Sequence, residues 1–111
     1  PRLGFALFNM PGIDLSNVYF SVPLFANTLQ ANCAQVSRTI YNTTTQLAGE
    51  VSTYEDLWRF TIANYHAGPG CVSYAIHQAW QNTGTLNWAE VAKYFTEPCQ
   101  GVIPYVEKIT R

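Results

Sequence analysis

The chain has 111 residues, of which 48% are hydrophobic and 12% are charged, and its formal net charge at pH 7 is -1. This length suits one domain with a single core, and the composition excludes an intrinsically disordered chain. The near-zero net charge argues against nucleic acid as the main partner, and no apolar run approaches the ~20 residues that span a bilayer. Because the sequence begins with Pro1 rather than methionine, we expect a processed product or a fragment of a longer protein.

The beginning of the chain carries the weaker helical signals. Residues 1–12 form an apolar lead-in, after which Asp14 or Ser16 can cap a helix from about residue 17 to residue 30. Pro23 lies inside this span, so we expect the helix to kink there or to begin later.

A second helical segment is expected over residues 32–41. Val36 and Ile40 stand four residues apart there, on one face of a helix. Residues 42–50 are polar and include a glycine, and we interpret them as a loop or as a frayed extension of this helix.

The second half of the chain marks its helices more clearly. Ser52-Thr53-Tyr54-Glu55 predicts a capping box, in which the Ser52 hydroxyl accepts from a free amide and the Glu55 carboxylate reaches back to another. The helix that follows is expected to end at Gly68, because glycine adopts a left-handed cap without a Cβ penalty and Pro69 cannot continue the helix. Its apolar face is expected to consist of Leu57, Trp58, Thr61, Ile62 and Tyr65.

Further helices are expected downstream. Residues 72–80 repeat the i, i+3, i+4 apolar pattern until Asn82-Thr83-Gly84 ends the helix. Asn87-Trp88-Ala89-Glu90 is a second capping box, Pro98 ends the helix that it opens, and residues 104–111 can form a last short helix. No stretch alternates with period two. The predicted fold class is therefore all-α, with about five helices and no significant sheet.

The three cysteines favour an oxidising compartment. Cys71 and Cys99 flank the last two predicted helices, and a bridge between them closes a loop of about 29 residues, which the chain-entropy model values at about 3–4 kcal/mol. Cys33 is then left over, either buried as a small apolar residue or bonded to a missing segment. The alternative is three buried thiols in a reduced protein. With the low lysine content, the disulfide favours an extracellular, periplasmic or cell-wall location.

Three motifs resemble those of one enzyme family. Tyr65-His66-Ala67-Gly68-Pro69-Gly70, followed by Val72, resembles the Ala-Tyr-Asn-Ala-Gly-Pro-Gly-x-Val motif of soluble lytic transglycosylases, lysozyme-like enzymes that cut the glycan strands of peptidoglycan. Ile103-Pro104-Tyr105-Val106-Glu107-Lys108-Ile109 resembles the family's closing motif, in which a Tyr-Val pair precedes a basic and an aliphatic residue. Residues 13–18 are similar to the turn that opens a middle helix in those enzymes. The resemblance implies a single lysozyme-like helical domain over residues 1–111.

The sequence departs from the family at the catalytic acid. The family's catalytic glutamate lies upstream of the middle helix in a Glu-Ser motif, which a Gly-Leu-x-Gln segment follows, and neither motif occurs here. His66 stands where the family has asparagine, Asn64 where it has alanine, and Gln100-Gly101 near a family Glu-Thr pair. The resemblance therefore implies the C-terminal half of such a domain, with no catalytic residue of its own. A missing N-terminal segment or a second chain would supply the acid.

The resemblance assigns the substrate-binding surface to Tyr65, His66, Gly68 and Tyr105. Tyr65 lines the sugar cleft, or it is a core tyrosine with its hydroxyl at the surface. His66 replaces the family asparagine as a sugar contact, or it is a histidine that the helix dipole favours at a helix C-terminus. Tyr105 faces the acid across the cleft, or it packs the last helix.

The remaining titratable residues have simpler interpretations. Glu55 and Glu90 are expected to serve the capping boxes, and Glu97 lies near the closing motif, but none of them is expected to be the catalytic acid. His77 is expected to be solvated. No metal site and no cofactor are expected, because no pair of histidines or cysteines has ligand-type spacing.

Two classes of function follow. The first is a peptidoglycan lytic transglycosylase, which binds the glycan strand or a related polysaccharide. With an upstream acid it would cleave the β-1,4 bond between N-acetylmuramic acid and N-acetylglucosamine, giving a 1,6-anhydro product. The second is a non-catalytic descendant that serves as a glycan-binding or structural and assembly domain. A third interpretation is a small secreted helical protein whose turn matches the family by chance.

Overall fold

The computed structural model describes residues 18–110, and every regular element in this range is a helix. The prediction of an all-α fold is confirmed. The expected lead-in over residues 1–12 and the caps at Asp14 and Ser16 lie outside the described residues. The elements in chain order are α2 (Val18–Thr44), α3 (Ala48–Val51), α4 (Tyr54–Ala67), α5 (Pro69–Thr83), α6 (Trp88–Ala92), the 3-10 helix η2 (Glu97–Cys99) and α7 (Val102–Ile109).

Helix α2 is longer than the sequence predicts. It begins before Pro23 and continues past it, so the expectation of a later start is wrong. The two predicted segments are one helix, within which the side-chain amide of Asn32 donates a hydrogen bond to the carbonyl of Thr28. The predicted loop over residues 42–50 contains the end of α2 and the beginning of α3.

The first capping box lies one residue later than predicted. Thr53, not Ser52, is the N-cap of α4, and its hydroxyl accepts from the backbone N–H of Asp56 at 3.1 Å. The Thr53 hydroxyl also donates to Asp56 Oδ2 at 2.9 Å. Ser52 instead donates to the carbonyl of Leu86, and Glu55 is exposed. The sequence offers two adjacent Ser/Thr–acid pairs, and the contacts of the buried Asp56 decide between them.

The later helix boundaries were predicted with mixed success. The prediction that Pro98 ends the helix opened by Asn87 is wrong, because α6 ends at Ala92 and Pro98 lies in η2, and the last helix begins at Val102 rather than at residue 104. Gly68 ends α4 and precedes Pro69, the first residue of α5, with φ 94° and ψ 162°. This is a positive φ with an extended ψ rather than the left-handed helical cap that was expected. Asn87 caps α6 and accepts from the backbone N–H of Glu90 at 2.8 Å, as predicted.

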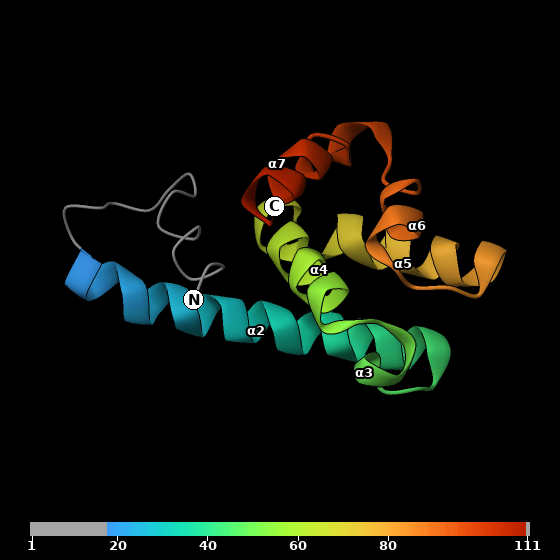
Figure 1. Ribbon diagram of the computed structural model, residues 1–111, viewed down its shortest axis with the longest axis horizontal. Helices are drawn as coiled ribbons and strands as arrows, with labels where there is room; N and C mark the ends of the chain where they lie inside the picture. Colours follow the sequence, from blue (N-terminus) through green and yellow to red (C-terminus); the bar gives the residue numbers. More distant parts are fainter. Residues whose placement is uncertain (1–17, 111) are drawn as a thin grey trace.

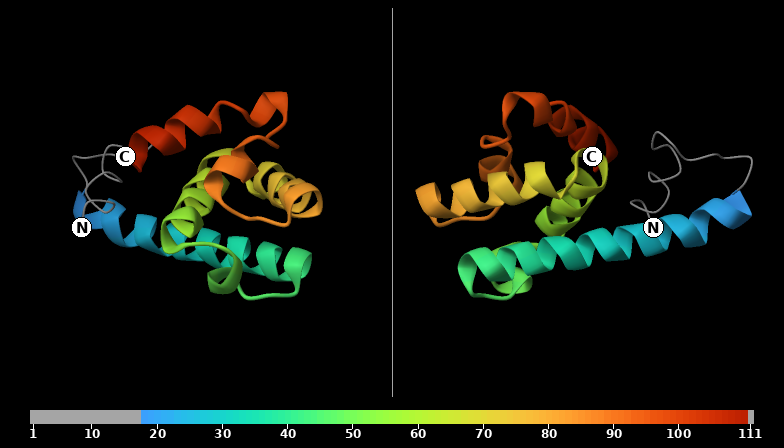
Figure 2. Two further views of the ribbon diagram at one scale, coloured as in Figure 1. Left: turned by 45° about the vertical axis from the view of Figure 1, so that its right-hand side comes forward. Right: turned by 180° about the vertical axis from the view of Figure 1, so that it is seen from behind.

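Helices α4 and α5 lie between α2 on one side and α7 on the other (Figures 1 and 2). Helix α4 is the centre of the fold, since it packs against α2, α5 and α7. The core consists of Val36, Ile40, Phe60, Ile62, Ala63, Val72, Ala75, Ile76, Ala79, Leu86, Trp88, Val91, Phe95, Val102 and Val106. This packing brings the end of α4 and the middle of α7 together.

Candidate functional site

The residues that the sequence singles out from two distant segments meet at one place. Tyr65 and His66 occupy the last turn of α4, and Tyr105 lies on α7. The rings of His66 and Tyr105 are stacked, with centroids 3.9 Å apart and planes 16° apart. His66 is exposed and Tyr105 is half-buried, so the stack lies at the surface where α4 ends.

The hydroxyl of Tyr105 has an unusual environment. Its oxygen is buried and makes no hydrogen bond within the described part of the chain. Burial, with a smaller contribution from the nearby Tyr65 phenol, raises the pKa of Tyr105 to about 12. A buried donor without a partner costs free energy, typically about 1–3 kcal/mol. The site therefore holds a neutral, buried O–H donor that has no acceptor among the described residues.

A small hollow lies beside this stack. Its volume is about 290 Å³, and it is lined by His66, Ala67, Cys71, Pro98, Cys99, Gly101 and Val102. None of the carboxylates in the described part of the chain belongs to this lining. The hollow is bounded on one side by the end of α4 and on the other by the segment from η2 to the start of α7.

A disulfide forms one wall of the hollow. Cys71 and Cys99 are bonded, with Cα atoms 6.0 Å apart, and Cys33 is a free thiol of intermediate burial. The predicted pairing is confirmed, and the alternative of three reduced thiols is wrong. The bridge ties the first turn of α5 to η2, and so it links the segment that follows His66 to the segment that precedes Tyr105.

A buried amide cluster stabilises the turn that precedes Tyr65. Asn64 is 3% exposed, and its side-chain nitrogen donates to Asn32 Oδ1 at 2.7 Å and to Gln35 Oε1 at 2.8 Å. These bonds join α4 to α2. The backbone carbonyl of Asn64 also accepts from the N–H of Gly68 at 2.9 Å. The side chain and the backbone carbonyl of Asn64 thus both fix the end of α4. Sequence reasoning missed this role because it depends on contacts with α2.

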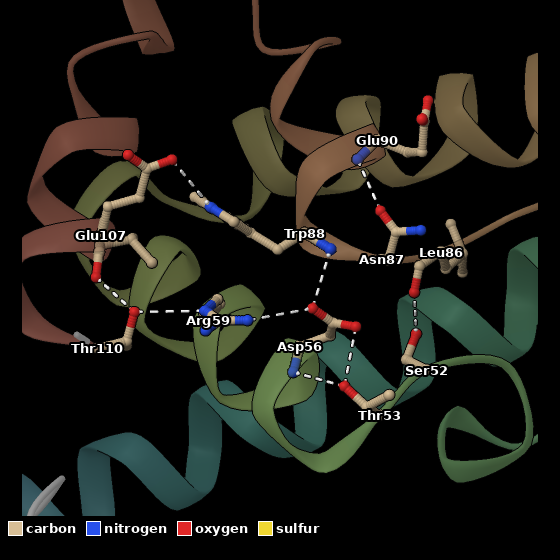
Figure 3. A network of polar contacts seen from close by, with 11 residues as sticks. Ser52, Thr53, Asp56, Arg59, Leu86, Asn87, Trp88, Glu90, Glu107 and Thr110 are labelled. Atoms are coloured by element: carbon tan, nitrogen blue, oxygen red, sulfur yellow. Dashed lines mark hydrogen bonds and ion pairs between the residues drawn. The ribbon is translucent and has the colours of Figure 1, made fainter.

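Asp56 is the second residue that sequence reasoning missed. It is 8% exposed, and its Oδ1 accepts from the backbone N–H of Trp88 at 3.0 Å (Figure 3). Arg59 lies 3.5 Å from the same oxygen and donates from Nε to Thr110 Oγ1 at 3.3 Å. The network joins α4, α6 and the end of α7. The pattern Thr53-x-x-Asp56 was the available signal, but it predicts a cap and not the contact with α6.

The remaining candidates lie apart from the stack. His77 is exposed on α5, and Glu90 pairs with Lys93 at 3.2 Å. In the part of the chain that is described, no group of three His, Cys, Asp or Glu residues could hold a metal ion. Within the same range, no helix is both long and apolar enough to cross a membrane.

Comparison of the chain with protein-family models, with curated proteins and with solved structures found no match.

Proposed function

We propose that this helical domain binds the glycan strand of peptidoglycan, or a related polysaccharide, at the surface formed by the ends of α4 and α7. One observation carries the proposal. The Tyr65–Gly70 motif and the Ile103–Ile109 motif each resemble a lytic transglycosylase motif, and the contact between His66 and Tyr105 joins them. A chance match of either motif gives no reason for the two segments to meet.

The chemistry of this surface suits a sugar. Ligand sites combine apolar and aromatic walls with a few convergent polar groups. His66 offers an exposed imidazole whose ring is held in place by the stack on Tyr105. The unpartnered Tyr105 hydroxyl offers a donor to a sugar hydroxyl, or to a carboxylic acid that works at the glycosidic bond.

Cleavage of the bond needs a group that these residues do not supply. A general acid must protonate the leaving oxygen, and glycosidases use a carboxylic acid for this step. The resemblance assigns that glutamate to a segment that precedes this sequence. We propose that this domain holds the strand and that the acid comes from such a segment or from a second chain. The corresponding location is extracellular, periplasmic or at the cell wall, which the Cys71–Cys99 disulfide supports.

The alternative is a non-catalytic glycan-binding or assembly domain. It is favoured by one observation, namely that no carboxylate of residues 18–110 lines the hollow beside His66. Both proposals require the same binding surface, and they differ only in whether the complete protein forms a product.

Binding is tested first, by sedimentation of the 111-residue chain with purified cell-wall sacculi. We expect His66→Ala to weaken binding by about tenfold, because a tenfold change in affinity corresponds to the free energy of about one aromatic contact. His77→Ala is the matched control, because His77 is an exposed histidine outside the hollow, and it should bind like the wild type. Equal binding of the two variants, or no binding by the wild type, contradicts the proposal.

Cleavage is tested on the full-length protein. Loss of turbidity of the sacculi and 1,6-anhydro-muropeptides in the mass spectrum would support the lytic transglycosylase. Binding without these products would leave the glycan-binding domain as the function.

A further inference from the structure

A second hollow lies between α4, α6 and α7, and among the described residues it shares no lining residue with the first. It has a volume of about 480 Å³, within the range of small-ligand sites. Helix α4 contributes Asp56 and Arg59, the start of α6 contributes Trp88, and α7 with its C-cap contributes Glu107 and Thr110. Figure 3 shows these side chains converging from the three helices.

Three charged side chains line the hollow, namely Asp56, Arg59 and Glu107, and no ion pair joins Arg59 to Glu107. Arg59 forms its ion pair with Asp56, and Glu107 accepts from the indole N–H of Trp88. Glu107 and Thr110 stand three residues apart and so share a face of α7. Arg59 reaches this face, because its Nε donates to the hydroxyl of Thr110. A guanidinium and a carboxylate therefore border the same space from two helices.

The contacts that hold these charged groups are long. Arg59 lies 3.3 Å from Thr110 Oγ1 and 3.5 Å from Asp56 Oδ1, and Glu107 lies 3.4 Å from the Trp88 nitrogen. Charge-assisted hydrogen bonds are ordinarily about 2.7–2.9 Å long. Arg59 has five N–H donors, of which these contacts use two. Both charged groups thus retain hydrogen-bonding capacity that a ligand can use.

The two carboxylates of the hollow, those of Asp56 and Glu107, differ in how many hydrogen bonds they already accept. Asp56 is occupied, because it accepts from the Trp88 backbone and from the Thr53 hydroxyl. Glu107 is exposed and holds one long contact, so it is the carboxylate that can accept from a ligand. Trp88 is 6% exposed, which leaves no open ring face on which a sugar could stack. The hollow therefore suits a small ligand that carries an anionic and a cationic group.

We propose that this hollow binds a small zwitterion, namely a free amino acid or a dipeptide whose amino and carboxyl termini are both unblocked. Arg59 receives the carboxylate and Glu107 receives the ammonium. The proposal does not rest on glycan binding, because the His66 hollow is lined by other residues.

The test is a titration of the 111-residue chain with alanyl-alanine, followed through the side-chain NMR signals of Arg59 Nε–H and Trp88 Nε1–H. We expect saturable shifts of both signals. N-acetylated alanyl-alanine and alanyl-alanine amide should each bind about tenfold more weakly, because each lacks one charge-assisted contact. No saturable shift, or equal binding of the blocked and free dipeptides, overturns the proposal.

Two matched variants separate the site from a general charge effect. Glu107→Gln, on the surface of α7, should abolish the preference for the free amine over the acetylated form while leaving the fold intact. Glu90→Gln removes a carboxylate that lies outside the hollow and should keep the wild-type preference. If the two variants behave alike, the proposal is wrong. Glycan binding in the same samples reports on the other hollow, so the failure of one proposal is distinguishable from the failure of the other.

Discussion

The imidazole of His66 lies face to face with the phenol of Tyr105, 3.9 Å between ring centroids. This contact depends on two constraints from elsewhere in the chain. Asn64 holds the last turn of α4 against α2, and the Cys71–Cys99 bridge holds the approach to α7 against α5. The relative position of the two rings is therefore set by tertiary contacts on either side of them, and not by the flexibility of an isolated helix end.

Alkaline pH is expected to destabilise the fold through Tyr105. Its pKa is about 12 in the folded chain, against an ordinary value of about 10 for an unfolded tyrosine. Between these values the unfolded chain has lost the proton that the folded chain keeps, so stability falls as pH rises from about 10 to about 12 and is unaffected below that range. Urea unfolding of the wild type and of Tyr105→Phe at pH 9, 10 and 11, values that bracket about 10, measures this.

Tyr105→Phe should lose less stability than the wild type over that interval. The variant keeps the ring and removes the buried hydroxyl, so below pH ~10 we expect it to be as stable as the wild type or more stable by about 1 kcal/mol. Ultraviolet absorbance at 295 nm should show that the variant lacks the tyrosine ionisation with a pKa of about 12. Parallel pH profiles of the two proteins would contradict the assignment.

Gly68 should not tolerate a side chain, although there is room for one. A Cβ at this position meets nothing within 4 Å, but φ is 94° with ψ 162°, a conformation that is nearly restricted to glycine. We expect Gly68→Ala to lower the free energy of unfolding by about 1–3 kcal/mol. Thermal unfolding followed by circular dichroism gives the value.

Gly70 provides the control for this substitution. It lies in the first turn of α5 with a negative φ and open space around its Cα. Gly70→Ala should therefore be neutral or stabilising, by up to about 1 kcal/mol. Similar losses in both variants would show that backbone conformation is not the reason for glycine at Gly68.

Loss of the Cys71–Cys99 bridge should destabilise the domain by about 3–4 kcal/mol, the chain-entropy value for a loop of this length. Comparison of urea unfolding for Cys71→Ser/Cys99→Ser with the oxidised wild type measures the difference. Cys33→Ser is the control, since Cys33 is a free thiol. Alkylation under non-reducing, denaturing conditions should modify Cys33 alone, and a mass increase for three thiols would contradict the pairing.

The helix boundaries that were predicted correctly depend on local chemistry. Gly68 and Pro69, which stand next to each other, separate α4 from α5, and Asn87 caps α6 through a residue three positions away. The disulfide was predicted because its two cysteines bracket a pair of well-marked helices. Signals of this kind lie within a few residues and do not require knowledge of the packing.

The errors arise where distant residues decide the outcome. The sequence predicts one helix to about residue 30 and another from Asn32, yet α2 runs through this point without a break, and Asn32 accepts a hydrogen bond there from Asn64 on α4. The resemblance placed Tyr105 on the binding surface, but no periodicity could reveal that its ring stacks on His66, since this depends on how α4 and α7 pack. The second hollow was not predicted either, because its charged groups come from separate helices and meet only when these helices pack.

Asp56 should be the most sensitive polar residue of the domain. Replacing it with alanine leaves the backbone N–H of Trp88 without its acceptor and removes the partner of the Thr53 cap. We expect Asp56→Ala to lower the free energy of unfolding by about 2–4 kcal/mol, and Thr53→Ala to lower it by about 1 kcal/mol. Urea denaturation at neutral pH measures both.

Glu55→Ala is the matched control, because it removes the neighbouring carboxylate. Glu55 is exposed, and no hydrogen bond or ion pair of its side chain is found within the described residues, so we expect a change of at most about 0.5 kcal/mol. The comparison decides between the two capping boxes that the sequence offers. A larger loss for Glu55→Ala than for Asp56→Ala would favour the Ser52–Glu55 box. That result would also contradict the role of Asp56 in fixing α6, and therefore the position of Trp88 in the wall of the hollow assigned to the zwitterion.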